Sequence, residues 1–170
     1  FLDAVLSQCD IYMFPVTIDA HMELGLKAMS LPRESTKAPH LATGGMDGKI
    51  RLWDLDTREM VMELKGHRSV VPRVVFAAQD ALLVSCSFDK TLAVWDTATG
   101  ERRGTMEGHE DAVSCCDVSP GDEYIVSVSL DVTARLWQFS DLSCVRIFKA
   151  KGTSWLKAVR FSPTSPVLAT

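Results

Sequence analysis

The 170-residue sequence lacks the features that mark membrane proteins and broad nucleic-acid binders. It has no run of about 18 apolar residues, so we expect no membrane span. Basic residues do not outnumber acidic ones, and the net charge of −4 argues against a large nucleic-acid footprint. We therefore expect neither membrane insertion nor direct contact with nucleic acid.

Patterns for metal binding and disulfide bonding are also missing. The five cysteines are odd in number and include no CxxC pair, which argues against a zinc site and a disulfide framework. The histidines show no paired ligand spacing; they are His21, His40, His67 and His109. We expect thiols in a reducing compartment, no metal, no cofactor, and an intracellular location, either cytoplasmic or nuclear.

Neither end of the sequence carries a targeting pattern. The opening FLDAVLSQCDIYMFPV has no basic stretch before its apolar part and no small-residue cleavage site, so we predict no signal peptide. The sequence starts at Phe1 and stops at Thr170 inside the apolar run SPVLAT. Because domain ends normally fall in exposed polar segments, we expect the chain to be a piece of a longer protein.

What the sequence does contain is a repeat of 42 residues. Trp53, Trp95 and Trp137 follow one another at that interval, and each lies six positions after an Asp. Each repeat also has four short runs rich in Val, Ile and Leu, separated by Gly, Asp, Ser or Pro, which predict strands. Four strands in a repeat of this length are typical of a β-propeller blade.

Further polar residues recur in register with the tryptophans. A Ser or Thr stands four positions before each Asp, and Gly-His stands at the start of two repeats. With this Gly-His, Ser/Thr, Asp and Trp-Asp pattern, the sequence from about residue 26 onward resembles the WD-repeat family. The resemblance implies an all-β fold, a β-propeller of four-stranded antiparallel blades in an incomplete ring.

We expect three full blades and a partial blade at each end. The full blades are expected at about 26–65, 68–107 and 110–150. Residues 1–24 would be a degenerate partial blade with Phe14 in the Trp position, and 152–170 would start the next blade. The two ends could instead combine into one blade, with a strand at 153–162; we expect a missing remainder rather than this closure.

The resemblance also implies a structural role for the recurring polar residues. In the family, the His, Ser/Thr, Asp and Trp of one blade form a hydrogen-bonded chain that ties the loop between blades to the inner strands. This is chemically sound, because an indole can only donate and a carboxylate orients an imidazole. The implied residues are His67, Ser85, Asp89, Trp95, His109, Ser127, Asp131 and Trp137, with Thr43, Asp47 and Trp53 as a partial set lacking a His.

Ser, His and Asp are also the components of a hydrolase triad. A triad needs one nucleophile in one cleft, whereas these residues recur in successive repeats, and the sequence has no G-x-S-x-G nucleophile elbow. We therefore predict no catalytic residue, no small-molecule substrate and no enzymatic activity.

The family's partner-binding positions can be carried over by their spacing from His and Asp. They are Met46, Val70, Pro72, Phe88, Leu130, Trp155 and Lys157. Gly25, Lys27, Ala112 and Ser114 occupy the remaining equivalent positions. The apolar character of the first set fits a face that binds other proteins or peptides; alternatively, some of these side chains pack into neighbouring loops.

The predicted function is a non-catalytic scaffold for protein–protein interaction in an intracellular multiprotein complex. One alternative is a substrate-receptor subunit of a ubiquitin ligase. Family members of that kind often have Arg or Lys two residues after Trp-Asp, where this chain has Asp56 and Ala98. Another alternative is a regulatory propeller attached to an enzyme domain outside these residues.

Overall fold

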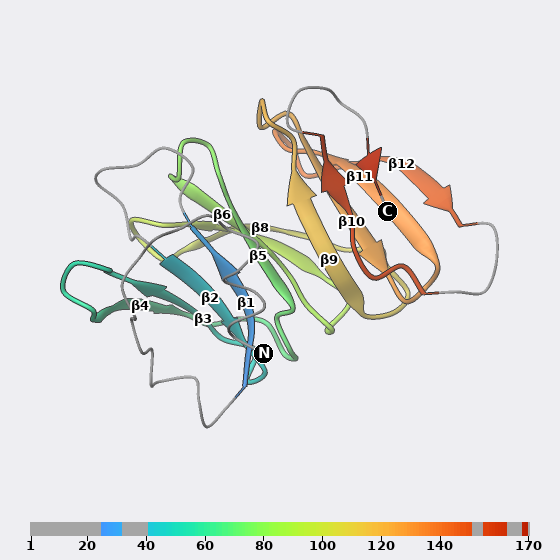
Figure 1. Ribbon diagram of the computed structural model, residues 1–170. Helices are drawn as coiled ribbons and strands as arrows, with labels where there is room; N and C mark the ends of the chain where they lie inside the picture. Colours follow the sequence, from blue (N-terminus) through green and yellow to red (C-terminus); the bar gives the residue numbers. More distant parts are fainter. Residues whose placement is uncertain (1–24, 32–40, 151–154, 163–167, 170) are drawn as a thin grey trace.

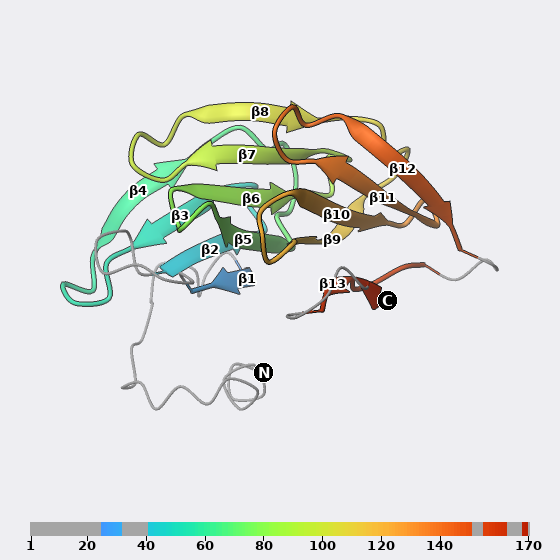
Figure 2. The ribbon, with the colours of Figure 1, turned by 90° about the horizontal axis from the view of Figure 1, so that it is seen from above.

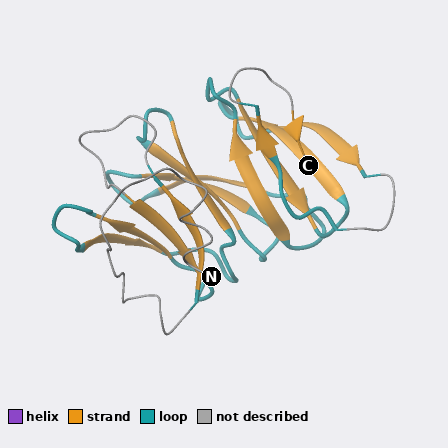
Figure 3. Cartoon of the chain, in the orientation of Figure 1, coloured by secondary structure: helices purple, strands orange, loops and turns teal. Residues whose placement is uncertain are grey.

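A computed structural model describes residues 25–31, 41–150, 155–162 and 168–169. These residues form strands, turns and irregular segments (Figure 3). Because this part of the chain forms no helix, it contains no helical membrane span. The predicted all-β class is thus confirmed. The predicted partial blade at 1–24, including Phe14, lies outside the described residues.

Most of the chain folds into three four-stranded antiparallel sheets, in which the strands follow one another in chain order. The first sheet contains β1 (Leu26–Ser30), β2 (Leu41–Gly45), β3 (Ile50–Trp53) and β4 (Met60–Leu64). The second contains β5 (Arg73–Ala77), β6 (Leu82–Cys86), β7 (Leu92–Asp96) and β8 (Arg102–Met106). The third contains β9 (Val113–Val118), β10 (Tyr124–Ser129), β11 (Thr133–Gln138) and β12 (Cys144–Lys149).

The three sheets stand side by side in an open arc (Figures 1 and 2). Strands β1, β5 and β9 lie on the inner side of the arc, and β4, β8 and β12 lie on its outer side. A short pair, β13 (Arg160–Phe161) and β14 (Leu168–Ala169), follows the third sheet on the inner side. The four-stranded blades are therefore confirmed, and the described sheets do not close into a ring.

Strand β6 of the second sheet shows why an inner strand is mostly apolar on both faces. In β6, Leu83 packs toward the first sheet, whereas Val84 and Cys86 pack toward the third. Successive side chains of a strand point to opposite faces, so a strand covered on both sides favours apolar residues on both faces. The short strand is consequently buried along almost its whole length.

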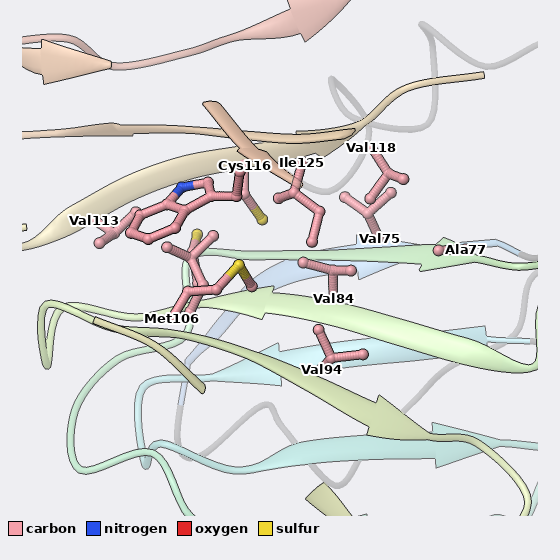
Figure 4. Close-up of a cluster of buried hydrophobic side chains, with 12 residues drawn as sticks. Val75, Ala77, Val84, Val94, Met106, Val113, Cys116, Val118 and Ile125 are labelled. Carbon is pink, nitrogen blue, oxygen red and sulfur yellow. The ribbon is translucent and has the colours of Figure 1, made fainter. Parts of the chain in front are cut away.

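Two apolar clusters join the sheets face to face. Between the first and second sheets, the cluster includes Ile50, Leu52, Leu64, Phe76 and Trp95. Between the second and third, it includes Val84, Met106, Val113, Ile125 and Trp137 (Figure 4). A smaller cluster lies on the face of the third sheet that points away from the second sheet, and it contains Cys115, Val126, Val128, Ala134 and Val159. The residues before β13 thus begin to cover the third sheet.

Candidate functional site

The second sheet contains a buried chain of polar side chains that links a loop to two strands. His67, in the loop before β5, places Nδ1 2.9 Å from Asp89 Oδ2 and Nε2 2.8 Å from Ser85 Oγ. The Trp95 indole N–H donates to the same Ser85 oxygen over 2.8 Å. These hydrogen bonds connect the loop before β5, the tight turn after β6, and the two central strands, β6 and β7.

The third sheet repeats this arrangement almost atom for atom. His109 Nδ1 lies 2.8 Å from Asp131 Oδ2, and Nε2 lies 2.8 Å from Ser127 Oγ. The Trp137 indole donates to Ser127 Oγ over 2.9 Å. Both serines are fully buried, so neither hydroxyl is presented to a substrate.

The direction of each hydrogen bond in the second sheet follows from the chemistry of its groups. An ionised carboxylate can only accept, so His67 Nδ1 carries the proton that is donated to Asp89. In the neutral ring Nε2 then accepts, and Ser85 donates to it while accepting from the Trp95 indole. Every member of the chain is satisfied, which is the condition under which a buried polar network favours one geometry.

The aspartate also holds the tight turn that follows β6. Asp89 Oδ2 accepts from the Arg68 amide over 2.9 Å, and Oδ1 accepts from the Thr91 amide and hydroxyl. Burial alone would raise the pKa of Asp89, but hydrogen bonds from His67, Arg68 and Thr91 hold it well below its usual range. The carboxylate stays ionised far into the acid range.

The matching pair in the third sheet shows opposite effects of burial on its two members. Burial would raise the pKa of Asp131, but hydrogen bonds from Thr133, His109 and the Glu110 amide lower it to about 2. Burial lowers the pKa of His109, and the nearby Asp131 offsets this only in part. At neutral pH the pair is thus an imidazole beside a carboxylate.

The first sheet has a related arrangement that includes an arginine. Trp53 Nε1 donates to Thr43 Oγ1 over 2.8 Å. Asp47 Oδ2 accepts from Arg51 Nη2 over 2.8 Å, and this buried guanidinium also lies 3.3 Å from Glu63 Oε2. Arg51 was not identified from the sequence, although its spacing of four residues after Asp47 was available as a signal.

The glycine of each Gly-His pair is explained by close packing as well as by backbone conformation. Gly66 has φ of +154°, and a Cβ there would collide with the guanidinium of Arg102 and approach the Trp95 ring to 3.1 Å. That guanidinium lies over the Trp95 ring, 4.8 Å from its centroid. Gly108 repeats the arrangement with Arg135 in front of Trp137. A side chain at either glycine would displace the cation from the indole.

A backbone ladder crosses one end of the sheets and joins their tight turns to the loops between sheets. In each sheet, the residue before the turn Asp donates its N–H to the loop: Met46 to Gly25, Phe88 to Val70 and Leu130 to Ala112, over 2.9–3.2 Å. Between sheets, the Val71 N–H donates to Gly45 and the Val113 N–H to Ser87, over 3.0 and 3.1 Å. These bonds place Met46, Val70, Phe88 and Leu130 in one continuous row.

The predicted partner-binding residues differ in how far they reach solvent. Met46, Phe88 and Trp155 are large apolar residues with exposed fractions of 50%, 42% and 64%. Lys157 is also exposed, while Val70, Pro72 and Leu130 are half-buried. We call the row together with Pro72, Trp155 and Lys157 the loop face. The segment that carries Trp155 and Lys157 is bonded to the third sheet through Ser114, whose hydroxyl donates to the Leu156 carbonyl over 2.6 Å.

The described residues do not meet the requirements of a metal site. Among them, no three His, Cys, Asp or Glu side chains come together in a way that could hold a metal ion. The imidazoles of His67 and His109 instead form hydrogen bonds with Ser and Asp partners.

Comparison with known proteins agrees with this architecture. The model of the family described as "WD domain, G-beta repeat" matches residues 16–54, 58–96 and 100–138. Each of the last two matches takes the outer strand of one sheet and the three inner strands of the next. The sequence repeat is therefore offset from the structural sheet, and each of these two repeats bridges two sheets.

Several curated proteins are similar to part of the chain. U3 snoRNP-associated protein-like EMB2271 of Arabidopsis thaliana is 42% identical over 57 residues, 34% of this chain and 12% of that protein. WD repeat and SOCS box-containing protein 1 of Xenopus tropicalis is 44% identical over 52 residues, covering 30% and 12%. U5 small nuclear ribonucleoprotein 40 kDa protein of Dictyostelium discoideum is 33% identical over 51 residues, covering 30% and 14%. The matched segments thus span only about an eighth of these relatives.

Proposed function

This chain belongs to the WD-repeat family, and we propose that it is a non-catalytic platform that binds other proteins or peptides within an intracellular multiprotein complex. WD-repeat domains are generally non-catalytic interaction modules, which supports a protein-interaction role. Two of the similar proteins are named for ribonucleoprotein particles, which are multicomponent assemblies. The binding surface in this proposal is the loop face.

The observation that carries the proposal is the row of exposed apolar side chains on a hydrogen-bonded backbone. Met46 and Phe88 remain half exposed although their amides are fixed to the neighbouring loops. Large apolar groups held on a rigid backbone lose little conformational entropy on binding, and such groups dominate the energetics of protein interfaces. Trp155 adds the most exposed large apolar residue of the described chain.

The buried polar chains have a supporting role in this proposal. Asp89 and Asp131 bind both the His of the loop and the amide that follows it, so they fix the loops that carry Val70 and Ala112. A loop positioned by a buried network presents its contact residues without an ordering cost on binding. In this proposal the His–Ser–Asp–Trp networks hold the loops of the loop face in position and do not contact the partner.

The test is affinity purification of partners with the whole chain and with single variants. Phe88→Glu and Trp155→Ala should each remove a bound partner, because they change exposed contact residues. Val61→Glu is the matched control, since Val61 is 55% exposed on β4, away from the loop face. Unchanged partner recovery with folded Phe88→Glu and Trp155→Ala proteins would refute the proposal.

A substrate-receptor role in a ubiquitin ligase and a regulatory propeller beside an enzyme domain are narrower versions of the same binding function. Both need sequence outside the present chain. Recovery of ubiquitin-ligase subunits with a full-length parent would favour the first, and a catalytic domain encoded in the flanking sequence would favour the second.

A further inference from the structure

Positive charge without a partner lies beside the first apolar groups of the loop face. The carboxylates of the turns, Asp47 and Asp89, are occupied by hydrogen bonds from within their own sheets. Lys27 and Arg68 are exposed, and within the described part of the chain neither is in an ion pair. Lys90 adds a third cation, because among the described residues its Nζ bonds to the carbonyl of Glu110 and to no carboxylate.

The backbone places Lys27 and Arg68 next to Met46. Lys27 lies at a β-bulge, since the register shifts between Leu26 and Ala28, so it has no partner in the ladder of β2. Arg68 lies in a loop packed against the turn that carries Met46, because a Cβ on Gly48 would be 3.0 Å from the His67 and Ser69 carbonyl oxygens. Lys27 therefore lies near Met46, and Arg68 lies between the turns that carry Met46 and Phe88, since its amide also bonds to Asp89.

The third sheet reverses this charge at equivalent positions. Arg68 and Ser69 follow His67 in the second sheet, whereas Glu110 and Asp111 follow His109 in the third. Both acidic residues are exposed. The exposed charges beside the loop face are thus basic at the first two sheets and acidic at the loop before the third, so they present different chemistry to the two ends of a bound segment.

We propose that the Met46–Phe88 half of the loop face binds an acidic, extended peptide segment. A large apolar side chain of the segment covers Met46 and Phe88, and carboxylates on either side of it pair with Lys27 and Arg68. Guanidinium and carboxylate groups match in geometry, and complementary charge sets the orientation and partner choice at such a surface. The proposal rests on the proposed function and adds the chemistry of the partner.

A peptide fits this half better than a nucleic acid. The chain has a net charge of −4, and Glu110 and Asp111 lie next to the cations along the row, so a continuous phosphate backbone would meet repulsion. The exposed apolar side chains beside the cations are the thioether of Met46 and the phenyl ring of Phe88, which suit an apolar anchor.

The experiment uses the whole chain and two libraries of labelled short synthetic peptides. Each peptide has one central Leu or Phe, flanked by Asp and Glu in one library and by Lys and Arg in the other. Fluorescence polarisation should show binding to the acidic library. The double variant Lys27→Glu/Arg68→Glu should weaken that binding by about tenfold, since exposed ion pairs contribute modestly, and should favour the basic library.

A matched control separates local from overall charge. Arg146→Glu/Lys149→Glu makes the same charge change on the exposed strand β12 and should leave the affinity for the acidic peptides within about twofold. Circular dichroism of each variant verifies that the sheets are folded.

The outcomes distinguish the two proposals. If Phe88→Glu abolishes peptide binding while the Lys27/Arg68 reversal leaves the acidic preference unchanged, the platform stands and the acidic partner is overturned. If folded Phe88→Glu and charge-reversed proteins bind every peptide as before, both proposals fall. A labelled single-stranded RNA that binds more tightly than the acidic peptides, and loses affinity on the same charge reversal, also overturns the peptide assignment.

Discussion

The outer strands of the three sheets differ in burial although their residues occupy the same register. Leu64 of β4 and Met106 of β8 pair with the first residue of the preceding strand and are each only 1% exposed. Phe148 of β12 takes the corresponding place opposite Ala134 but is 36% exposed. The first two side chains are covered by the next sheet, whereas only the segment around β13 lies on the third sheet.

This difference shows that the outer strand of a sheet is buried only where a second sheet packs against it. A sheet of this repeat can bury one face only against its neighbour, as in other arrays of stacked units. On β12, Val145 and Ile147 are exposed together with Phe148. Phe148 lies on the uncovered face and Ile147, the residue before it, on the opposite face, and exposed apolar groups of this kind promote association. The interior interfaces therefore provide stability, while the last face is a surface where further protein can pack.

The largest effect should come from truncating a covered outer-strand residue. Met106→Ala should lower the free energy of unfolding by about 2–5 kcal/mol, because a cavity forms between the second and third sheets. Phe148→Ala removes a larger side chain but should cost only about 1 kcal/mol or less, because much of that ring is already solvated. Urea unfolding followed by tryptophan fluorescence measures both; equal losses would contradict the comparison.

The next effect concerns the polar chain inside the interface between the first two sheets. Ser85→Ala removes the acceptor of the Trp95 indole and the partner of His67 Nε2, leaving buried groups unsatisfied. We expect a loss of about 1–3 kcal/mol in unfolding free energy. Ser140→Ala, at an exposed turn, is the control and should change it by less than about 0.5 kcal/mol. A silent Ser85→Ala would show that the network contributes nothing to stability.

The covered networks should also make the fold sensitive to acid. The pKa of His109 is lowered in the folded chain, so the unfolded chain takes up that proton first and stability falls as the pH drops below about 6.5. A second loss is expected between about pH 4 and 2, where the unfolded chain protonates the Asp131 position and the folded chain does not. Urea unfolding across this pH range measures both steps.

The variant His109→Gln tests the assignment of the first step. Glutamine does not titrate, so the variant should lose that step and keep the more acidic one. A pH profile identical to that of the unchanged chain would show that another group is responsible.

The smallest effect on folding should come from the exposed apolar residues of β12. Val145→Lys/Ile147→Lys should change the unfolding free energy by less than about 0.5 kcal/mol, because both side chains are exposed. The same change should reduce self-association, which we expect for the unchanged 170-residue chain. Sedimentation equilibrium gives the association state, and Val61→Lys on β4 serves as the control. A monomeric unchanged chain would contradict the assignment of β12 as an association surface.

Much of the fold was predictable because its signals are local and periodic. The tryptophan interval and the apolar runs gave the strand order, and the Gly-His positions pointed to the loops that now contain His67 and His109. The buried guanidinium of Arg51 was missed, because arginine is rarely buried and its partners Asp47 and Glu63 come from a turn and a different strand. The grouping of basic residues near Met46 and of acidic residues near the third sheet also required the structure, because it depends on which loops pack beside which turns.

The sequence alone determined the all-β class and the 42-residue unit, since alternation and turn chemistry act over a few residues at a time. Only the tertiary structure decided which side chains of equivalent position reach solvent. Phe88 and Leu130 illustrate this: both stand directly before the turn Asp and were expected on the binding face, yet Leu130 is half-buried and Phe88 is exposed. Solvent exposure depends on the loop or sheet that packs beside a residue, and that neighbour is distant in the chain.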